Sequence, residues 1–261
     1  MRIALGLEYD GRPFTGWQSQ ADGRGVQDAL ERALAVIADG TVRTIAAGRT
    51  DAGVHATMQV VHFDTAAARP DTAWVRGVNA HLPGDVAVLW GRPVADEFHA
   101  RYGAIARHYT YLLHNRAARP ALLAGRVGWY HRPLDVAAMT EAAVALVGTH
   151  DFSAFRAAEC QAKSPSRTLH RIAIAASGEH IRFDLCANAF LHHMIRNVVG
   201  ALVYVGAGRH PPSWIGELLA GRDRSRAAPT FAPDGLFFPG ADYDARWGLP
   251  ASRRPVALPS A

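Results

Sequence analysis

Apolar and polar residues alternate with two different periods along this chain, which predicts a mixture of strands and helices. Between residues 26 and 38 apolar residues recur every three or four positions, the spacing that places them on one face of a helix. Short runs rich in β-branched and aromatic residues are instead typical of strands. The predicted strands are 3–9, 59–63, 86–90, 109–113, 171–177, 180–187 and 235–238, with a further short strand near 44–47. The predicted helices are 26–38, 74–79, 136–147, 191–205 and 214–220.

These elements favour the α+β class. Strands and helices intermix without steady strand–helix–strand alternation, a pattern typical of mainly antiparallel sheets. The halves look like copies of one architecture that no sequence repeat relates, and we expect subdomains over 1–105 and 106–248. Residues 249–261 are rich in Pro, Arg, Ser and Ala, with little to bury, so we expect a mobile tail.

Charge gives a weak indication of the partner. Lys and Arg total 28 and Asp and Glu total 23, a net charge of +5 over 261 residues. An excess of this sign suits a polyanion. Lys163 is the only lysine, so nearly all basic residues are arginines. Arginine forms bidentate hydrogen bonds with phosphate and stacks on bases. A GC-rich genome explains the same arginine bias, so composition alone does not identify nucleic acid.

Cysteine usage and hydropathy indicate a cytoplasmic protein. Cys160 and Cys186 form no CxxC pair and no recognisable disulfide framework. A charge follows the first apolar residues too early for a signal peptide. The most apolar run, 198–208, is far short of the roughly 20 residues that a membrane span needs.

The segment richest in candidate chemistry is Ala-Gly-Arg-Thr-Asp-Ala-Gly-Val-His, residues 47–55, which lies between two predicted strands. Gly48 and Gly53 bracket it, so the backbone can turn sharply and approach a ligand closely. Arg49 and Asp51 stand inside the bracket. The residues alone leave two interpretations open, a functional loop or a plain turn with a solvated arginine.

This segment resembles, residue for residue, the signature of the bacterial tRNA pseudouridine synthase A family. The resemblance extends in order from about residue 3 to about residue 245. Its further motifs are 9–11 with 14–18, 77–85, 98–101, 151–155 and 188–197. Small departures occur at Ala56, Met58 and His108, none of which is a position assigned to chemistry.

The resemblance implies a fold and an activity. It implies two ferredoxin-like (RRM-like) subdomains whose sheets join into one extended sheet, with the active-site cleft between them. It implies that uridine on the 3′ side of the anticodon stem-loop of tRNA becomes pseudouridine, in a homodimer. Because this reaction is an isomerisation, we expect no cofactor and no metal.

Asp51 and Arg196 are the pair that the resemblance places at the reacting sugar. One ionised carboxylate beside C1′ can attack the sugar or take a proton, and the sequence does not choose between these routes. A neighbouring arginine favours the ionised form of a carboxylate, and the resemblance implies Arg196 for this role. Arg196 stands in an otherwise apolar helix, where an unpaired charge is costly, although a helix-edge position reaching water is the alternative.

Tyr109 and Arg49 are the other residues that the resemblance assigns to the substrate. It places Tyr109 against the target uracil, whereas the local pattern fits a core aromatic of a strand equally well. Arg49 would stack in the gap that the flipped base leaves, with a phosphate contact as the alternative. Six further arginines are weaker candidates for a phosphate-binding surface: Arg12, Arg24, Arg101, Arg107, Arg156 and Arg167.

Two other classes of function compete with this one. The chain has 13 histidines, and His55, His62 and Asp64 lie close together, but it has neither an HExxH nor a paired CxxC motif of a metal enzyme. A non-catalytic RNA-binding module could use the open face of an α+β sheet. The intact signature around Asp51, together with Arg196, favours the enzyme over both.

Overall fold

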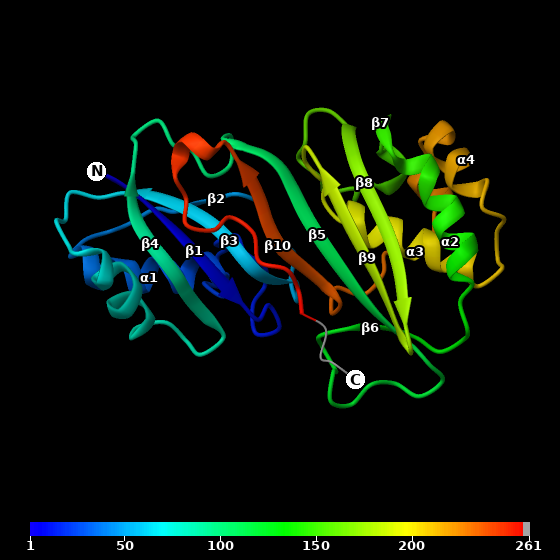
Figure 1. The fold of residues 1–261 in the computed structure, drawn as a ribbon, viewed down its shortest axis with the longest axis horizontal. Helices are drawn as coiled ribbons and strands as arrows, with labels where there is room; N and C mark the ends of the chain where they lie inside the picture. The colour runs from blue at the N-terminus through cyan, green and yellow to red at the C-terminus, as the bar shows by residue number, and fades with distance from the viewer. Residues whose placement is uncertain (258–261) are drawn as a thin grey trace. The chain divides into compact units, whose positions relative to one another are not determined.

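The computed structural model describes residues 1–257 (Figure 1). The chain forms two compact units. Unit 1 contains residues 1–107 and the chain from Phe237 onward, and unit 2 contains residues 108–236. None of the described helices combines the length and apolar character needed to cross a membrane.

Unit 1 is built on a sheet with the strand order β4-β1-β3-β10. Strands β1 and β3 pair antiparallel, with Leu5 opposite Val61, and β10 runs parallel to β3. The short strand β2 pairs with the other end of β3. The strands are β1 (Arg2–Tyr9), β2 (Ile45–Ala46), β3 (His55–Asp64), β4 (Val86–Val94) and β10 (Leu236–Tyr243).

Helix α1 (Val26–Ala38) follows from the apolar spacing of its sequence. The residues that recur at that spacing, Leu30 and Leu34 among them, are buried. The carboxylate of Asp28 accepts a hydrogen bond from the Gly25 N–H at 2.9 Å, which satisfies one of the otherwise unpaired donors of the first turn. The helix ends at Ala38. The next residue, Asp39, has a left-handed backbone (φ 52°) and donates its N–H to the Ala35 carbonyl.

Unit 2 contains a mainly antiparallel sheet covered by helices. Its strand order is β5-β9-β8-β7, and Ile174 of β8 lies opposite Phe183 of β9. The strands are β5 (Ala104–Asn115), β6 (Gly128–Tyr130), β7 (Gly148–Asp151), β8 (Ser166–Ser177) and β9 (His180–Ala187). The helices are α2 (Val136–Ala143), α3 (Met194–Gly206) and α4 (Trp214–Gly221), gathered on one side of the β8–β9 hairpin (Figure 1).

The α+β class and its mainly antiparallel pairing are confirmed. The structure divides the chain differently from the predicted ranges 1–105 and 106–248 at the second boundary. Strand β10 belongs to unit 1, because Phe237 and Phe238 pair with the start of β3.

The predicted tail falls partly on residues 258–261, which lie outside the described residues. Residues 249–257 make specific contacts. Arg253 forms a bridge with Gly240 of β10, and Arg254 pairs with Glu8 of β1 at 2.5 Å. The Thr57 hydroxyl donates to the Arg254 carbonyl at 2.5 Å, and Val256 is buried. Mobility of the tail stays a prediction. A mobile tail would have to break these contacts of residues 249–257.

Candidate active site

Asp51 lies at the centre of a loop, residues 47–54, that connects β2 to β3; we call it the signature loop. Both ends of the loop are tied to the sheet. The Ala47 N–H donates to the Val60 carbonyl at 2.8 Å, and the Gln59 amide donates to the Gly48 carbonyl at 2.6 Å. The Val54 N–H then closes a turn onto the Asp51 carbonyl at 3.2 Å, with Gly53 at φ +77°. The bracket of glycines therefore forms a tight turn that presents a half-buried carboxylate.

The end of β1 and the segment that follows it hydrogen-bond to the signature loop. The Trp17 N–H donates to the Thr50 carbonyl at 2.9 Å. The Tyr9 and Thr50 hydroxyls lie 2.8 Å apart in a buried hydrogen bond. Burial raises the pKa of Tyr9 to about 12, against the opposing effect of its hydrogen bonds with Thr50 and Gln59. Tyr9 therefore stays a neutral phenol that fixes the residue immediately before Asp51.

Two glycines permit this close approach. A Cβ atom at Gly11 would lie 2.0 Å from the Val54 carbonyl oxygen. A Cβ at Gly16 would lie 2.8 Å from the Thr50 carbonyl oxygen, and Gly16 also has φ +104°. The motif at 9–18 and the motif at 47–55 are thus two sides of one packed structure.

Asp10 and His55 lie beside the C-terminal end of the signature loop. The Gly11 N–H donates to Nδ1 of His55 at 3.2 Å, and the His55 ring stacks on Phe237 with centroids 4.7 Å apart. Burial alone would raise the pKa of Asp10, but hydrogen bonds from Arg12 and the charges of His55 and Arg12 outweigh it and lower the pKa to about 2. Asp10 is therefore ionised at neutral pH, a fixed negative charge beside the loop.

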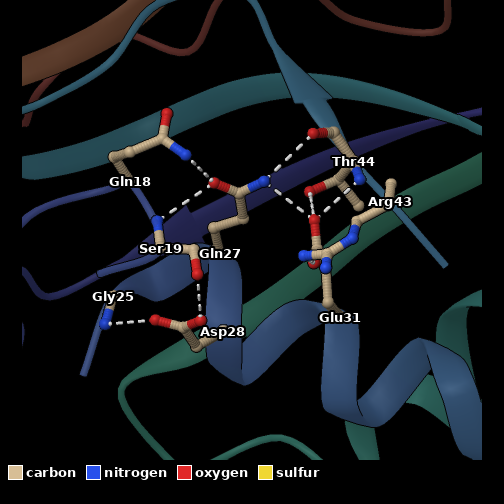
Figure 2. Close-up of polar contacts among 8 residues, drawn as sticks. All are labelled: Gln18, Ser19, Gly25, Gln27, Asp28, Glu31, Arg43 and Thr44. Atoms are coloured by element: carbon tan, nitrogen blue, oxygen red, sulfur yellow. Dashed lines mark hydrogen bonds and ion pairs between the residues drawn. The ribbon is translucent and has the colours of Figure 1, made fainter. Parts of the chain in front are cut away.

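A polar network joins α1 to the segment after Trp17 and to the residues that precede β2 (Figure 2). Its centre is Gln27 of α1, which is buried. The Gln27 Oε1 accepts from the Gln18 amide at 2.7 Å and from the Ser19 N–H at 3.1 Å. Its Nε2 donates to Glu31 at 2.8 Å and to the Thr44 carbonyl at 3.2 Å. One amide thus connects the segment after Trp17 with the residue that precedes β2.

Glu31 completes the network. Its Oε1 accepts from the Thr44 N–H at 2.8 Å and from the Thr44 hydroxyl at 3.0 Å, and its Oε2 pairs with exposed Arg43 at 3.2 Å (Figure 2). Because one half-buried carboxylate accepts from both the backbone and the side chain of Thr44, this set of contacts fixes the start of β2. The orientation of the signature loop is thereby coupled to α1.

Arg49 and Arg107 are placed differently although both are basic. The Arg49 side chain is exposed at the tip of the signature loop. The Arg107 guanidinium instead donates to the Ala47 carbonyl at 3.3 Å, to the Ala104 carbonyl at 2.9 Å and to the Arg101 carbonyl. Arg107, a weaker candidate for phosphate contact from the sequence, thus binds backbone carbonyls, whereas the Arg49 side chain is exposed.

Tyr109 lies on β5 of unit 2, and its side chain is buried. Its ring meets the Phe190 ring edge to face, with centroids 5.1 Å apart. The next residue on the same face, Tyr111, is fully buried and donates its hydroxyl to the Ala232 carbonyl at 2.9 Å. Both tyrosines thus lie in a buried stretch of the strand, with Tyr109 at 8% exposed and Tyr111 at 0%.

Arg196 lies in the first turn of α3, and its side chain is half-buried. Its Nε donates to the Phe231 carbonyl at 2.8 Å, and the Phe231 N–H donates to the Arg196 carbonyl at 3.2 Å. The next residue, Asn197, is completely buried and donates to the Phe155 carbonyl at 2.8 Å. These bonds hold Nε of the guanidinium against the loop before β10.

The candidate metal ligands His55, His62 and Asp64 each hydrogen-bond to a different residue. Nδ1 of His55 accepts from Gly11, and Nδ1 of His62 accepts from the Ala100 N–H at 3.1 Å. The Asp64 carboxylate accepts hydrogen bonds from Nε and Nη2 of Arg2, both at 2.8 Å. Burial, followed by the charges of Arg2 and His99, lowers the pKa of His62 to about 4. The three side chains thus have different hydrogen-bond partners, Gly11, Ala100 and Arg2.

Comparison with known proteins identifies the family. The family model described as tRNA pseudouridine synthase matches residues 7–103 and 142–244. A tRNA pseudouridine synthase A of Methylobacillus flagellatus is 58% identical over 99% of this chain and 99% of the relative. One from Chromobacterium violaceum is 62% identical over 96% of each chain, and one from Aromatoleum aromaticum is 59% identical over 99% and 98%.

Among solved structures, a chain of a Cbf5-Nop10-Gar1 complex is similar at a TM-score of 0.38 and 11% identity, over 91% of this chain and 48% of that chain. That likeness is too weak to bear on the assignment, which rests on sequence. The family model spans well over half of the chain, and the relatives match it almost from end to end. The resemblance of the signature is thereby confirmed, and the chain belongs to the tRNA pseudouridine synthase family, whose enzymes isomerise uridine to pseudouridine.

Proposed function

We propose that this enzyme acts on uridines on the 3′ side of the anticodon stem-loop of tRNA, with Asp51 as its essential carboxylate. The observation that carries the proposal is the signature loop itself. Asp51 is half-buried on a loop that β3, Tyr9 of β1 and Trp17 hold by backbone and side-chain hydrogen bonds, so its carboxylate has a defined position. Defined placement of one reactive group is what proximity catalysis requires.

The reaction needs little beyond this carboxylate. The N1–C1′ bond breaks, the uracil turns, a C5–C1′ bond forms, C5 loses a proton and N1 gains one. Asp51 can attack C1′ or remove a proton to give a glycal-like intermediate. Both routes conserve all atoms of the substrate and consume no oxidant, reductant or nucleotide.

The remaining roles follow from the family resemblance. We propose that Tyr109 stacks on the target uracil, that Arg196 supplies the positive charge that keeps the carboxylate ionised, and that Arg49 fills the gap left by the flipped base. The burial of Tyr109, the hydrogen-bonded guanidinium of Arg196 and the exposure of Arg49 support these roles. We further propose a cytoplasmic homodimer in which one tRNA touches both subunits, which light scattering of the purified enzyme tests.

The site of modification is tested in cells and in vitro. Pseudouridine mapping of tRNA from a deletion strain should show loss on the 3′ side of the anticodon stem-loop, restored by the wild-type gene. Purified enzyme should release tritium from transcripts carrying 5-³H-uridine at those positions. Loss confined to another part of tRNA would overturn the anticodon assignment, and no tritium release from any tRNA would overturn the activity.

Tyr109 variants separate stacking from proton relay. Tyr109→Phe keeps the ring and should keep most of the affinity for tRNA, because a base still stacks on it. Turnover should fall well below wild type if the hydroxyl relays a proton. Tyr109→Leu should also weaken positioning. Single-turnover rates and filter binding measure both effects, and equal activity of all three proteins would remove Tyr109 from the site.

Arg196→Met should change the pH dependence of the reaction. Methionine fills a similar volume but leaves the reactive carboxylate without its positive neighbour, so ionisation becomes harder. The acid limb of the pH–rate profile should therefore move to higher pH, with reduced turnover at neutral pH. A profile that superimposes on wild type, at normal turnover, would show that Arg196 only supports the Phe231 loop.

A further inference from the structure

An aromatic side chain stands largely in solvent on the turn between β4 and β5. Tyr102 is 77% exposed. Its ring stacks on His99 with centroids 4.4 Å apart and planes 30° from parallel. His99 in turn lies 4.8 Å from the ring of buried His62. Three rings thus lead from the core of unit 1 to its surface, and Tyr102 is the outermost.

Hydrogen bonds within the turn fix this arrangement. Nδ1 of His99 accepts from the N–H groups of Arg101 at 3.2 Å and Tyr102 at 3.1 Å. The Gly103 N–H closes the turn onto the His99 carbonyl at 2.8 Å. A Cβ at Gly103 would lie 2.8 Å from that carbonyl oxygen, so the closed turn requires glycine. The Tyr102 ring is therefore held in place by its own turn without being buried.

The turn is also attached firmly to the core. The half-buried Tyr243 donates its hydroxyl to the Ala100 carbonyl at 2.5 Å, and His62 accepts from the Ala100 N–H at 3.1 Å. Burial raises the pKa of Tyr243, so its hydroxyl keeps the proton that it donates. Arg2 donates to the Phe98 carbonyl at 2.8 Å. An exposed ring on so rigid a base loses little conformational entropy when a ligand stacks on it.

A cation lies beside the Tyr102 ring, and one arginine links this turn to the signature loop. The exposed Arg101 guanidinium lies 5.6 Å from the centroid of the Tyr102 ring. Arg107 donates to the Arg101 carbonyl and also to the Ala47 carbonyl, at the start of the signature loop. Asp96 and Glu97, on the preceding turn, attract the positive charge of Arg2 and raise its pKa. The ring is thus flanked by a cation and tied through one guanidinium to the loop that carries Asp51.

We propose that the turn formed by His99, Arg101 and Tyr102 is a stacking platform for an unpaired base of the tRNA substrate, with Arg101 binding an adjacent phosphate. This inference rests on the proposed function. Unpaired RNA bases are recognised by stacking on exposed aromatic rings, which tolerates any base, and arginine suits the phosphate beside them. The rigid ring, the cation beside it and the shared support with the signature loop favour RNA over a second copy of the chain as the occupant.

Removal of the Tyr102 ring tests the platform. Tyr102→Ala should weaken binding of an unmodified tRNA transcript about 5- to 150-fold, the range expected for one base stacked on one aromatic ring. Tyr102→Phe should bind close to wild type, because the ring remains. The slope of log affinity against log salt should stay unchanged in Tyr102→Ala, whereas Arg101→Ala should lower it by about 0.7–0.9, the value for one phosphate. Filter binding across a salt series measures all four proteins.

A matched control removes an exposed apolar side chain elsewhere in unit 1. Val36 on α1 is 58% exposed, and Val36→Ala should leave tRNA affinity and thermal unfolding unchanged. Unaltered affinity in folded Tyr102→Ala would overturn the platform. A fall in the molecular mass of Tyr102→Ala in light scattering would overturn it in favour of a contact between copies. If wild type itself neither binds nor converts tRNA, the proposed function fails first, so the two failures are distinguishable.

Discussion

Asp51→Asn should reduce pseudouridine formation below detection while the protein stays folded and still binds tRNA. The change is nearly isosteric, so the turn closed by Val54 onto the Asp51 carbonyl should persist. It replaces a carboxylate by an amide, which is a poor nucleophile and a poor base. Affinity for tRNA should be at least that of wild type, because a negative charge near phosphate is removed.

Single-turnover conversion of unmodified tRNA, with filter binding on the same preparation, measures both properties. The variant also separates the classes of function, since a pure binding module has no turnover to lose. Conversion by folded Asp51→Asn at even about a tenth of the wild-type rate, a barrier difference of only ~1.4 kcal/mol, would remove Asp51 from its central role.

Gly11→Ala should damage catalysis from a position outside the signature loop. The added Cβ would lie 2.0 Å from the Val54 carbonyl oxygen, a backbone atom that cannot rotate away. Either the segment after β1 or the signature loop must shift. Misplacement of a reactive group by about 1 Å can cost on the order of 10²-fold in rate, so we expect a fall in kcat of that order with a lowered melting temperature.

Gly40→Ala provides the matched control. Gly40 follows α1 in the same unit, and a Cβ there meets nothing within 4 Å. That variant should keep wild-type turnover and melting temperature. The measurement is single turnover well below the melting temperature of each protein, so that loss of rate is not loss of fold. Wild-type rates in Gly11→Ala would show that the signature loop does not depend on this contact.

Long regular segments were predictable because their signals are local. Helix α1 spans the predicted residues 26–38, and the β8–β9 hairpin turns at Gly178 as its sequence indicates. Helix α3 begins at Met194 rather than 191, because His193 adopts a left-handed backbone (φ 59°) that a helix cannot continue through. Strand β10 runs to Tyr243 rather than ending at the predicted residue 238, since the bridge between Gly240 and Arg253 extends its pairing. The short strands β6 and β7 carried too few residues for a periodic signal.

The candidate site was predictable only as a list of residues. The signature indicated Asp51 and Arg49, but nothing local to it indicates that Gly11 and Gly16 pack beneath it, about 40 residues away in sequence. The same holds for Gln27 and Glu31, which read as ordinary polar positions of an amphipathic helix. Their function in the network depends on Thr44, and such pairings between distant segments leave no periodic trace.

The discontinuity of unit 1 has a consequence for synthesis on the ribosome. Unit 2 is one uninterrupted stretch, whereas unit 1 needs β10, which pairs with β3 beside the signature loop, and Arg254, which pairs with Glu8. Chains emerge at roughly 5–20 residues per second from the N-terminus. The inserted unit can therefore complete its fold while the unit that carries Asp51 still lacks a strand. The signature loop consequently lacks its neighbouring strand until the chain from Phe237 onward has been made.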